Sequence, residues 1–201
     1  MQLFHSKTSP FVRKVMVTAH ELGLVDRLEL LPSAAHPVNR DAGIVARNPL
    51  GQVPTLVLDD GTVLADSRVI CEYLDDLGGG SVFPAAGPAR WTALAAQSTG
   101  DGLLDAALLT VYETRVRGEG ERSPAWVEGQ RAKIEGGLGA IEAAAPGLGD
   151  RVDIAAITYG CALGYLDLRF ADIGWRDRYP AAAAWFAEFD ARPSMRATQP
   201  G

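Results

Sequence analysis

The sequence predicts two domains of different class: a small mixed α/β domain in residues 1–77 and an all-helical domain in residues 89–201. Strand-like and helix-like segments alternate through residues 1–77 in the order β-α-β-α-β-β-α. A break rich in glycine and proline follows at residues 78–88 (GGGSVFPAAGP) and is typical of a linker. Beyond it no segment alternates as a strand does. The first half therefore favours a small mixed sheet with helices packed on it.

The elements of the first domain follow from local patterns. Residues 10–22 form a helical pattern because Phe11, Val15, Ala19 and Leu22 share one face, and Gly23 suits the end of that helix. The helix that follows residues 55–66 begins at Asp66 or Ser67. The remaining predictions are strands at 2–5 and 27–31, a weak helix at 37–48, and two strands in 55–66 about the turn at residues 59–61.

The second domain contains four helical patterns, at residues 91–117, 125–145, 153–172 and 179–192. Gly100 and Gly102 weaken the first of them, so a bend is expected there. The stretch DRVD at residues 150–153 resembles a capping box. It predicts Asp150 as the N-cap of the third helix, with Asp153 favoured by the helix dipole.

Composition excludes several classes of protein. The 201 residues are 47% hydrophobic and 22% charged, an ordinary globular balance that can bury a core without disulfides or metal. A net charge of −6 argues against a protein that binds nucleic acid or an anionic membrane. Cys71 and Cys161 lie far apart in apolar, helix-like contexts, which predicts two buried free thiols and no metal cluster.

The N-terminus lacks the pattern of a signal peptide, and no stretch approaches the roughly 20 apolar residues of a membrane span. A soluble, cytoplasmic protein is therefore expected.

Three stretches of the first domain stand out as candidates for chemistry. The first is TSPF, where Ser9 precedes Pro10, the favoured residue at the first helical position. This order makes Ser9 the N-cap of the helix. The second is NPLGQVP at residues 48–54, directly before a strand. The third is the pair Asp66-Ser67 at a helix start.

These stretches, together with GYLDLRF and ARPSMRAT nearer the C-terminus, resemble bacterial glutathione transferases. The resemblance covers essentially the whole chain in order. It implies a thioredoxin-like N-terminal domain, an all-α C-terminal domain and a homodimer. It also implies glutathione as co-substrate, with no metal. The absence of cysteine from TSPF counts against the cysteine-type classes, and the absence of tyrosine from Phe4-His5 counts against the tyrosine-type classes.

The resemblance also implies roles for the three stretches. The Ser9 hydroxyl can accept an N–H from the helix and donate to the glutathione thiolate, although Thr8 is an open alternative. Val53-Pro54 resembles the family's cis-proline, whose preceding residue pairs with the extended peptide. Gln52 suits the glycine end of glutathione, and Asp66 and Ser67 suit the ammonium and carboxylate of its γ-glutamyl end.

The resemblance places the second substrate against one face of the first long helix of the second domain. The alternative is that this face packs in the core of the domain. The function implied is activation of the glutathione thiol for attack on a small, apolar electrophile, a detoxifying reaction. The alternatives are a glutathione-binding protein of the same fold without appreciable turnover, and a glutathione-dependent peroxidase or reductase. Phe11 is implied both for glutathione and for the second substrate, at the boundary of the two subsites. The other residues implied for the second substrate are Leu104, Leu108, Val111, Tyr112 and Arg115.

Overall fold

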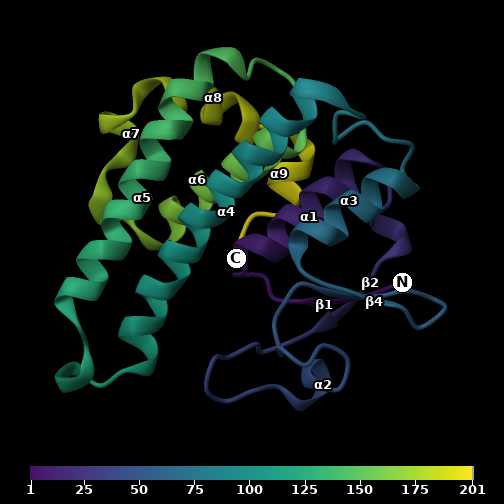
Figure 1. Ribbon diagram of the computed structural model, residues 1–201, viewed down its shortest axis with the longest axis horizontal. Coiled ribbons are helices and arrows are strands. Elements are labelled where there is room, and N and C mark those ends of the chain that lie inside the picture. The colour runs from purple at the N-terminus through teal and green to yellow at the C-terminus, as the bar shows by residue number, and fades with distance from the viewer. Residues whose placement is uncertain (201) are drawn as a thin grey trace. The chain divides into compact units, whose positions relative to one another are not determined.

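The computed structural model describes residues 1–200 and divides the chain into two compact units. The first unit holds Met1–Arg90 together with the chain from Pro193 onward, and the second holds Trp91–Arg192. The first unit contains a small mixed sheet with helices, and the second contains helices as its only regular elements (Figure 1). The predicted fold class, a mixed α/β domain and an all-α domain, is confirmed.

The sheet of the first unit has four strands in the order β2-β1-β3-β4. Strand β1 pairs in parallel with β2 and antiparallel with β3, which pairs antiparallel with β4. Helices α1 and α3 lie side by side on the sheet (Figure 1). The strands are β1 (Gln2–His5), β2 (Glu29–Pro32), β3 (Thr55–Val57) and β4 (Val63–Leu64), and the helices are α1 (Pro10–Glu21), α2 (Ala42–Val45), α3 (Ser67–Leu77) and α9 (Pro193–Ala197), with a short 3-10 turn at Val25–Arg27.

The core of the first unit forms where α1 and α3 meet the central strands. Leu3 of β1, Val15 of α1, Leu56 of β3 and Leu74 of α3 are all fully buried. Cys71 is buried and outside any disulfide, as is Cys161 in the second unit, which confirms the prediction of two buried thiols. The alternation of β1 and the helical spacing of α1 and α3 thus place their apolar faces together.

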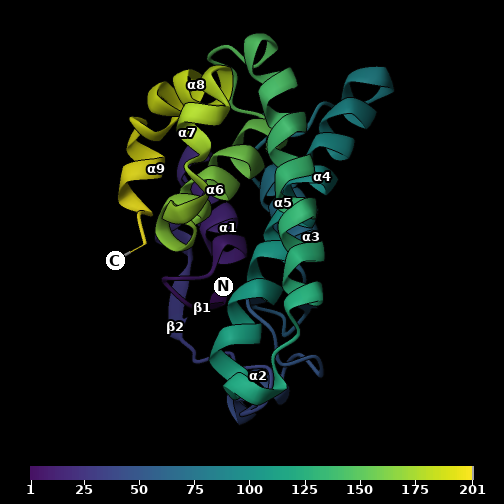
Figure 2. The same ribbon diagram turned by 90° about the vertical axis from the view of Figure 1, so that its left-hand side faces the viewer.

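The second unit begins within the long helix α4, which runs without interruption through Gly100 and Gly102. Helices α4 and α5 run antiparallel to each other (Figures 1 and 2). Its helices are α4 (Gly87–Val116), α5 (Pro124–Ala144), α6 (Ile154–Arg169), α7 (Trp175–Arg178) and α8 (Pro180–Asp190), and 3-10 turns lie at Glu119–Glu121, Ala145–Gly147 and Ala171–Ile173.

Three details differ from the sequence-based expectation. The weak helix of residues 37–48 is reduced to the four residues of α2, which begins after its N-cap Asp41, whose carboxylate accepts from the N–H groups of Gly43 and Ile44. Helix α6 begins at Ile154 with Asp153 as its N-cap, so the prediction of Asp150 was wrong: the Asp153 carboxylate accepts from the Ala156 N–H at 2.9 Å. Helix α9 was not predicted.

The chain between α3 and α4 is held firmly in the first unit by the buried carboxylate of Asp75. Its Oδ1 accepts from the N–H groups of Ser81 and Val82, at 2.8 and 2.6 Å, and its Oδ2 accepts from Phe83 at 3.0 Å. Arg90 donates to the carbonyl of Pro84 and pairs with Glu72. Three backbone donors and one carbonyl of the glycine-rich segment are thereby satisfied.

Gly100 allows α4 to pack closely against α6. A Cβ at this position would lie 2.7 Å from Cγ2 of Thr158, whereas a Cβ at Gly102 would meet nothing within 4 Å. We expect Gly100→Ala to destabilise the protein by about 1–3 kcal/mol through overpacking. Gly102→Ala should instead stabilise it by about 0.5–1 kcal/mol through helix propensity. Urea denaturation of both variants tests this contrast, and an unchanged midpoint for Gly100→Ala would contradict it.

Candidate functional site

The register of the sheet brings the three candidate stretches to one edge. Phe4 pairs with Thr55, so the end of β1 lies beside the beginning of β3. Leu56 pairs with Leu64, so β4 also ends at this edge. The turn that contains Ser9 follows β1, Val53-Pro54 precedes β3, and Asp66-Ser67 follows β4. Three segments that are far apart in the sequence therefore meet where two helices, α1 and α3, begin.

Ser9 is the N-cap of α1, as the sequence predicts. Its backbone is extended, with φ −81° and ψ 120°, and its Oγ accepts from the Val12 N–H at 3.3 Å. The side chain is half-buried, and its hydroxyl donates to no other atom in residues 1–200. The neighbouring Thr8 is exposed. Ser9 is thus held by the helix on its acceptor side, while its donor side stays available to a ligand.

The loop NPLGQVP is held by a buried asparagine at its start. The Asn48 Nδ2 donates to Oγ1 of Thr55 at 2.9 Å, and its Oδ1 accepts from the Leu50 N–H at 3.0 Å. The Thr55 hydroxyl donates in turn to the carbonyl of Gln52 at 2.7 Å, which leaves the Gln52 side chain exposed. Arg40 donates to the carbonyl of Pro49 from the side of α2. The loop therefore presents Gln52 and Val53 from a fixed backbone.

The Val53-Pro54 peptide bond is cis, as expected from the resemblance. The β1–β3 ladder begins at Thr55, so Val53 lies just outside the paired part of the strand. Val53 is half-buried and Pro54 is buried. An extended peptide that approaches this edge would find the backbone of Val53 beyond the last pair of the sheet.

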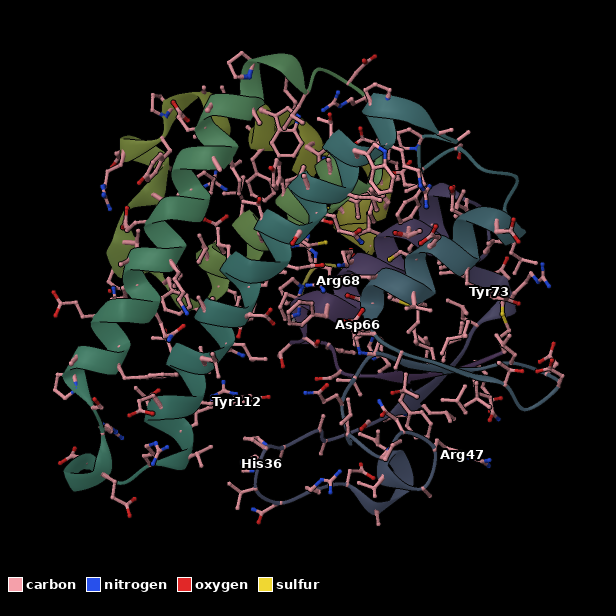
Figure 3. All side chains as sticks on the ribbon, in the orientation of Figure 1. His36, Arg47, Asp66, Arg68, Tyr73 and Tyr112 are labelled. Atoms are coloured by element: carbon pink, nitrogen blue, oxygen red, sulfur yellow. The ribbon has the colours of Figure 1, made fainter. Side chains whose placement is uncertain are left out.

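Asp66 and Ser67 form the N-terminus of α3. The Asp66 Oδ1 accepts from the Arg68 N–H at 2.8 Å, which makes Asp66 the N-cap, and its side chain is exposed. Ser67, the first helical residue, is 2% exposed. Asp66 and Arg68 both lie at the start of α3, and Tyr73 lies further along it (Figure 3). A carboxylate and the positive end of a helix dipole are thus adjacent here.

His5 ends β1 at the same edge of the sheet. Burial and the nearby charge of Lys7 lower the pKa of His5, so its imidazole is neutral at pH 7. The starts of α1 and α3 and the Lys7 ammonium supply positive potential at this edge. Phe11, in the first turn of α1, is half-buried, and the Lys14 ammonium lies 6.0 Å from its ring centroid.

Apart from Phe11 on α1, the residues expected to hold a second substrate lie on α4. Leu104 is fully buried, Leu108 and Tyr112 are half-buried, and Arg115 is exposed. Burial raises the pKa of Tyr112, against the opposing effect of the Arg115 charge, so the phenol keeps its proton at neutral pH. Tyr112 projects from the side of the helix in Figure 3.

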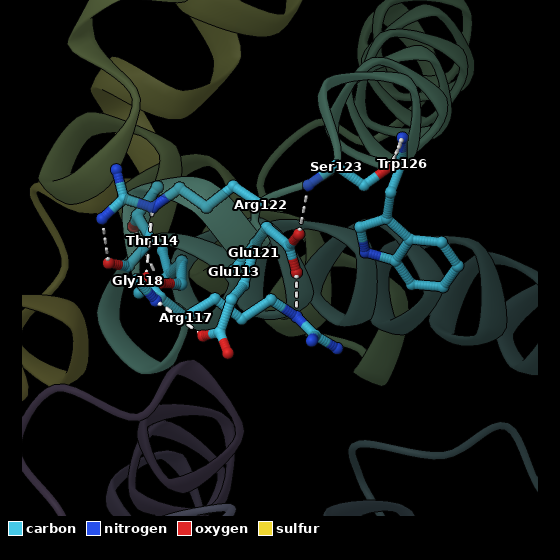
Figure 4. Close-up of polar contacts among 9 residues, drawn as sticks. Glu113, Thr114, Arg117, Gly118, Glu121, Arg122, Ser123 and Trp126 are labelled. Carbon is cyan, nitrogen blue, oxygen red and sulfur yellow. Dashed lines mark hydrogen bonds and ion pairs between the residues drawn. The ribbon is translucent and has the colours of Figure 1, made fainter.

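A polar network fixes the end of α4 that carries Tyr112 and Arg115 (Figure 4). The buried Glu113 accepts from Nε of Arg117 at 2.9 Å and from the N–H of Ser123 at 2.8 Å. Arg122 donates to the carbonyls of Thr114 and Arg117, at 3.0 and 3.2 Å. Because these contacts satisfy free carbonyls at the helix end, the last turn of α4 is well defined.

Two residues on α6 belong to the same region and were not predicted. Tyr165 is 4% exposed, and the charges of Arg115 and Arg169 both act on it. The stretch GYLDLR places Tyr165 and Arg169 four residues apart, on one face of a helix. That spacing is the sequence pattern from which these two residues could have been predicted.

Within residues 1–200, no group of three or more His, Cys, Asp and Glu side chains is arranged to hold a metal ion. None of the helices in the same range combines the length and apolar character that a membrane crossing requires.

Comparison with known proteins identifies the class to which this fold and site belong. A family model for the glutathione S-transferase N-terminal domain matches residues 8–77, and one for the glutathione S-transferase C-terminal domain matches residues 124–188. The chain belongs to the glutathione S-transferase family. The first match contains the three stretches that the sheet brings together.

Individual relatives agree with this assignment. The uncharacterized GST-like protein YibF of Escherichia coli K12 is 33% identical over 100% of this chain and 98% of its own length. A glutathione transferase family member from Pseudomonas fluorescens Pf-5 was solved with bound glutathione. It is 46% identical, covers 100% of this chain and 98% of that chain, and superposes with a TM-score of 0.97. A second structure of a glutathione transferase family member from the same organism contains bound S-(propanoic acid)-glutathione. It is 45% identical over 100% of both chains, with a TM-score of 0.92.

Proposed function

We propose that this protein is a glutathione transferase that activates the glutathione thiol for attack on a small electrophile. The observation that carries the proposal is the convergence of Ser9, Val53 and Asp66-Ser67 at one edge of the sheet. A tripeptide that carries an extended backbone, a thiol and a zwitterionic end requires these three kinds of partner. The family membership and the glutathione bound in the Pseudomonas relative support the same ligand.

The proposed binding mode assigns one part of glutathione to each stretch. The backbone of Val53 pairs with the cysteinyl residue as a short added strand. The Ser67 hydroxyl and the first amides of α3 receive the γ-glutamyl carboxylate, and Asp66 receives the neighbouring ammonium group. Gln52 donates to the glycine carboxylate, a contact without the charge that a lysine would provide.

Ser9 is the proposed catalytic residue. Its hydroxyl donates to the thiolate sulfur while its oxygen continues to accept from Val12. The N-terminus of α1 adds positive partial charge at the same point. A free thiol has a pKa of about 8.5, and a fall of one to two units corresponds to roughly 1.4–2.7 kcal/mol. One charge-assisted hydrogen bond and a helix end together supply that amount.

The second substrate is proposed to lie against α4, near Leu108, Tyr112 and Arg115, with Phe11 at the border of the two subsites. At an aryl halide the thiolate sulfur forms a bond to the carbon that bears the halogen, the halide leaves with the bonding electron pair, and the product is a thioether. The S-(propanoic acid)-glutathione bound in the Pseudomonas relative is a thioether of this kind and supports conjugation rather than peroxidase or reductase chemistry. A cytoplasmic homodimer without metal is proposed on family grounds.

Retention on immobilised glutathione, followed by a turnover assay with a panel of aryl halides, tests the proposal. We expect retention that free glutathione reverses, and a thioether product. Failure to be retained would contradict the glutathione site. Retention without turnover on the whole panel would favour a binding protein of the same fold. Gel filtration of the same preparation should give twice the 21.3 kDa of one chain.

A further inference from the structure

The second unit contains a group of two tyrosines and two arginines on α4 and α6. Tyr112 and Arg115 are three residues apart on α4, and Tyr165 and Arg169 are four residues apart on α6, so each pair lies on one face of its helix. We call these four residues the Tyr-Arg cluster. No part of the proposed glutathione site uses Tyr165 or Arg169.

The packing of α4 on α6 explains why the four residues come together. The helices touch closely where Gly100 meets Thr158 and Tyr159. From that contact, α4 continues toward Tyr112 and Arg115, and α6 continues toward Tyr165 and Arg169. This close approach of α4 to α6 brings the two pairs to neighbouring helices, and the charges of Arg169 and Arg115 and the phenol of Tyr112 all act on Tyr165. The polar network around Glu113 then holds the end of α4 in place.

The polar groups of the cluster are hydrogen-bond donors. Burial raises the pKa of Tyr165, against the opposing effect of the Arg169 and Arg115 charges, and burial likewise raises the pKa of Tyr112. Both phenols therefore keep their protons at neutral pH. The guanidinium of Arg169 cannot accept a hydrogen bond, so it leaves the Tyr165 proton for another acceptor. Two guanidinium groups add a positive charge each.

The nearest acids along the two helices are committed to other partners. Glu113 accepts from Arg117 and Ser123. Asp167 accepts from the Trp175 indole at 2.9 Å and from Arg176 at 2.7 Å. The cluster thus keeps an excess of donors and of positive charge.

Arg169 supplies the observation that points to a ligand. Its Nε is buried and hydrogen-bonds no other atom in residues 1–200. A buried donor without an acceptor is destabilising, and the great majority of such groups in proteins are paired. A guanidinium fork matches the two oxygens of a carboxylate, which accepts without donating.

We propose that the Tyr-Arg cluster binds a carboxylate carried by the second substrate, so that the protein selects anionic rather than purely apolar electrophiles. This inference rests on the proposed function and names the substrate class for it. The Arg169 Nε and the Arg115 guanidinium donate to the carboxylate oxygens, and the tyrosine hydroxyls complete the shell. The cluster positions the substrate and takes no part in bond formation.

A matched pair of electrophiles tests the proposal: 4-chloro-3-nitrobenzoate and its uncharged amide. In both, the glutathione thiolate forms an S–C bond at the carbon that bears chlorine, and chloride leaves with the bonding electron pair. We expect the wild type to favour the benzoate over the amide in kcat/KM. Arg169→Met and Arg115→Gln should each lower the ratio of kcat/KM for the benzoate to kcat/KM for the amide about tenfold, mainly through the KM of the benzoate. Lys133→Gln, which removes one exposed charge from α5, is the control and should change neither.

Calorimetry with glutathione conjugates separates this inference from the proposed function. The carboxyaryl conjugate should bind more tightly than its amide, and Arg169→Met should abolish the difference. S-methylglutathione reports on the glutathione site alone. If S-methylglutathione fails to bind, the proposed function is contradicted. If it binds but the two aryl conjugates bind equally in the wild type, the carboxylate site is contradicted while the transferase proposal stands.

Discussion

Replacing Asp75 with alanine is expected to destabilise the protein by about 3–5 kcal/mol. The carboxylate accepts three backbone N–H groups between residues 81 and 83, and those of Val82 and Phe83 are buried. Each buried donor left without an acceptor costs about 1–3 kcal/mol. Alanine offers none. Chemical denaturation monitored by circular dichroism measures the loss.

The neighbouring acid provides the control for this prediction. Asp76 is exposed, so Asp76→Ala removes the same charge from the same helix without a buried partner and should change stability by no more than about 0.5 kcal/mol. Asp75→Asn keeps one acceptor oxygen and should fall between the two. Equal effects of Asp75→Ala and Asp76→Ala would show that the three hydrogen bonds carry no net stability.

Replacing Ser9 with alanine is expected to raise the apparent pKa of the bound glutathione thiol by about one to two units. The variant loses a donor to an ionised sulfur, and a hydrogen bond to a charged group contributes about 1.5–3 kcal/mol. At pH 7 the thiolate fraction, and with it kcat/KM, should fall about tenfold or more. Ultraviolet titration of the thiolate in the binary complex measures the pKa directly.

Two further variants separate the roles of the Ser9 hydroxyl. Alanine also removes the cap of α1, at a cost of about 1 kcal/mol, whereas glycine is a good N-cap and costs only a few tenths. Ser9→Gly should therefore raise the thiol pKa while the fold stays almost as stable. Thr8→Ala should leave the pKa unchanged. If instead Thr8→Ala raises it and Ser9→Gly does not, the catalytic hydroxyl is that of Thr8.

The local elements of the first unit could be predicted from the sequence because their signals are short in range. Ser9-Pro10 marks the start of α1, and the Asp66-Ser67 pair marks the start of α3. The meeting of the three stretches at one edge of the sheet could not be predicted, because it depends on the strand register, which pairs residues about 50 apart. Register depends on tertiary contacts that no local pattern records.

Other features were missed because they depend on partners distant in the chain or on a choice between equivalent groups. Asp75 looks like any acid at the end of a helix until the segment after it folds back onto its carboxylate. Asp150 and Asp153 are equally good caps in the sequence, and packing of the apolar residues from Ile154 onward selected the second. Tyr165 and Arg169 gain significance only beside α4. Helix α9 is too short for its periodicity to predict it.

The position of α9 bears on the order in which the protein is assembled. The guanidinium of Arg13 in α1 donates to the carbonyl of Met195, and the Ser194 hydroxyl pairs with Glu21, so the last segment completes the same unit that the first residues begin. During synthesis the whole helical unit leaves the ribosome before this segment does. The mixed-sheet unit, although begun first, is therefore completed only after the helical unit has been made, and a fragment cut at residue 90 would lack a part of its own packing.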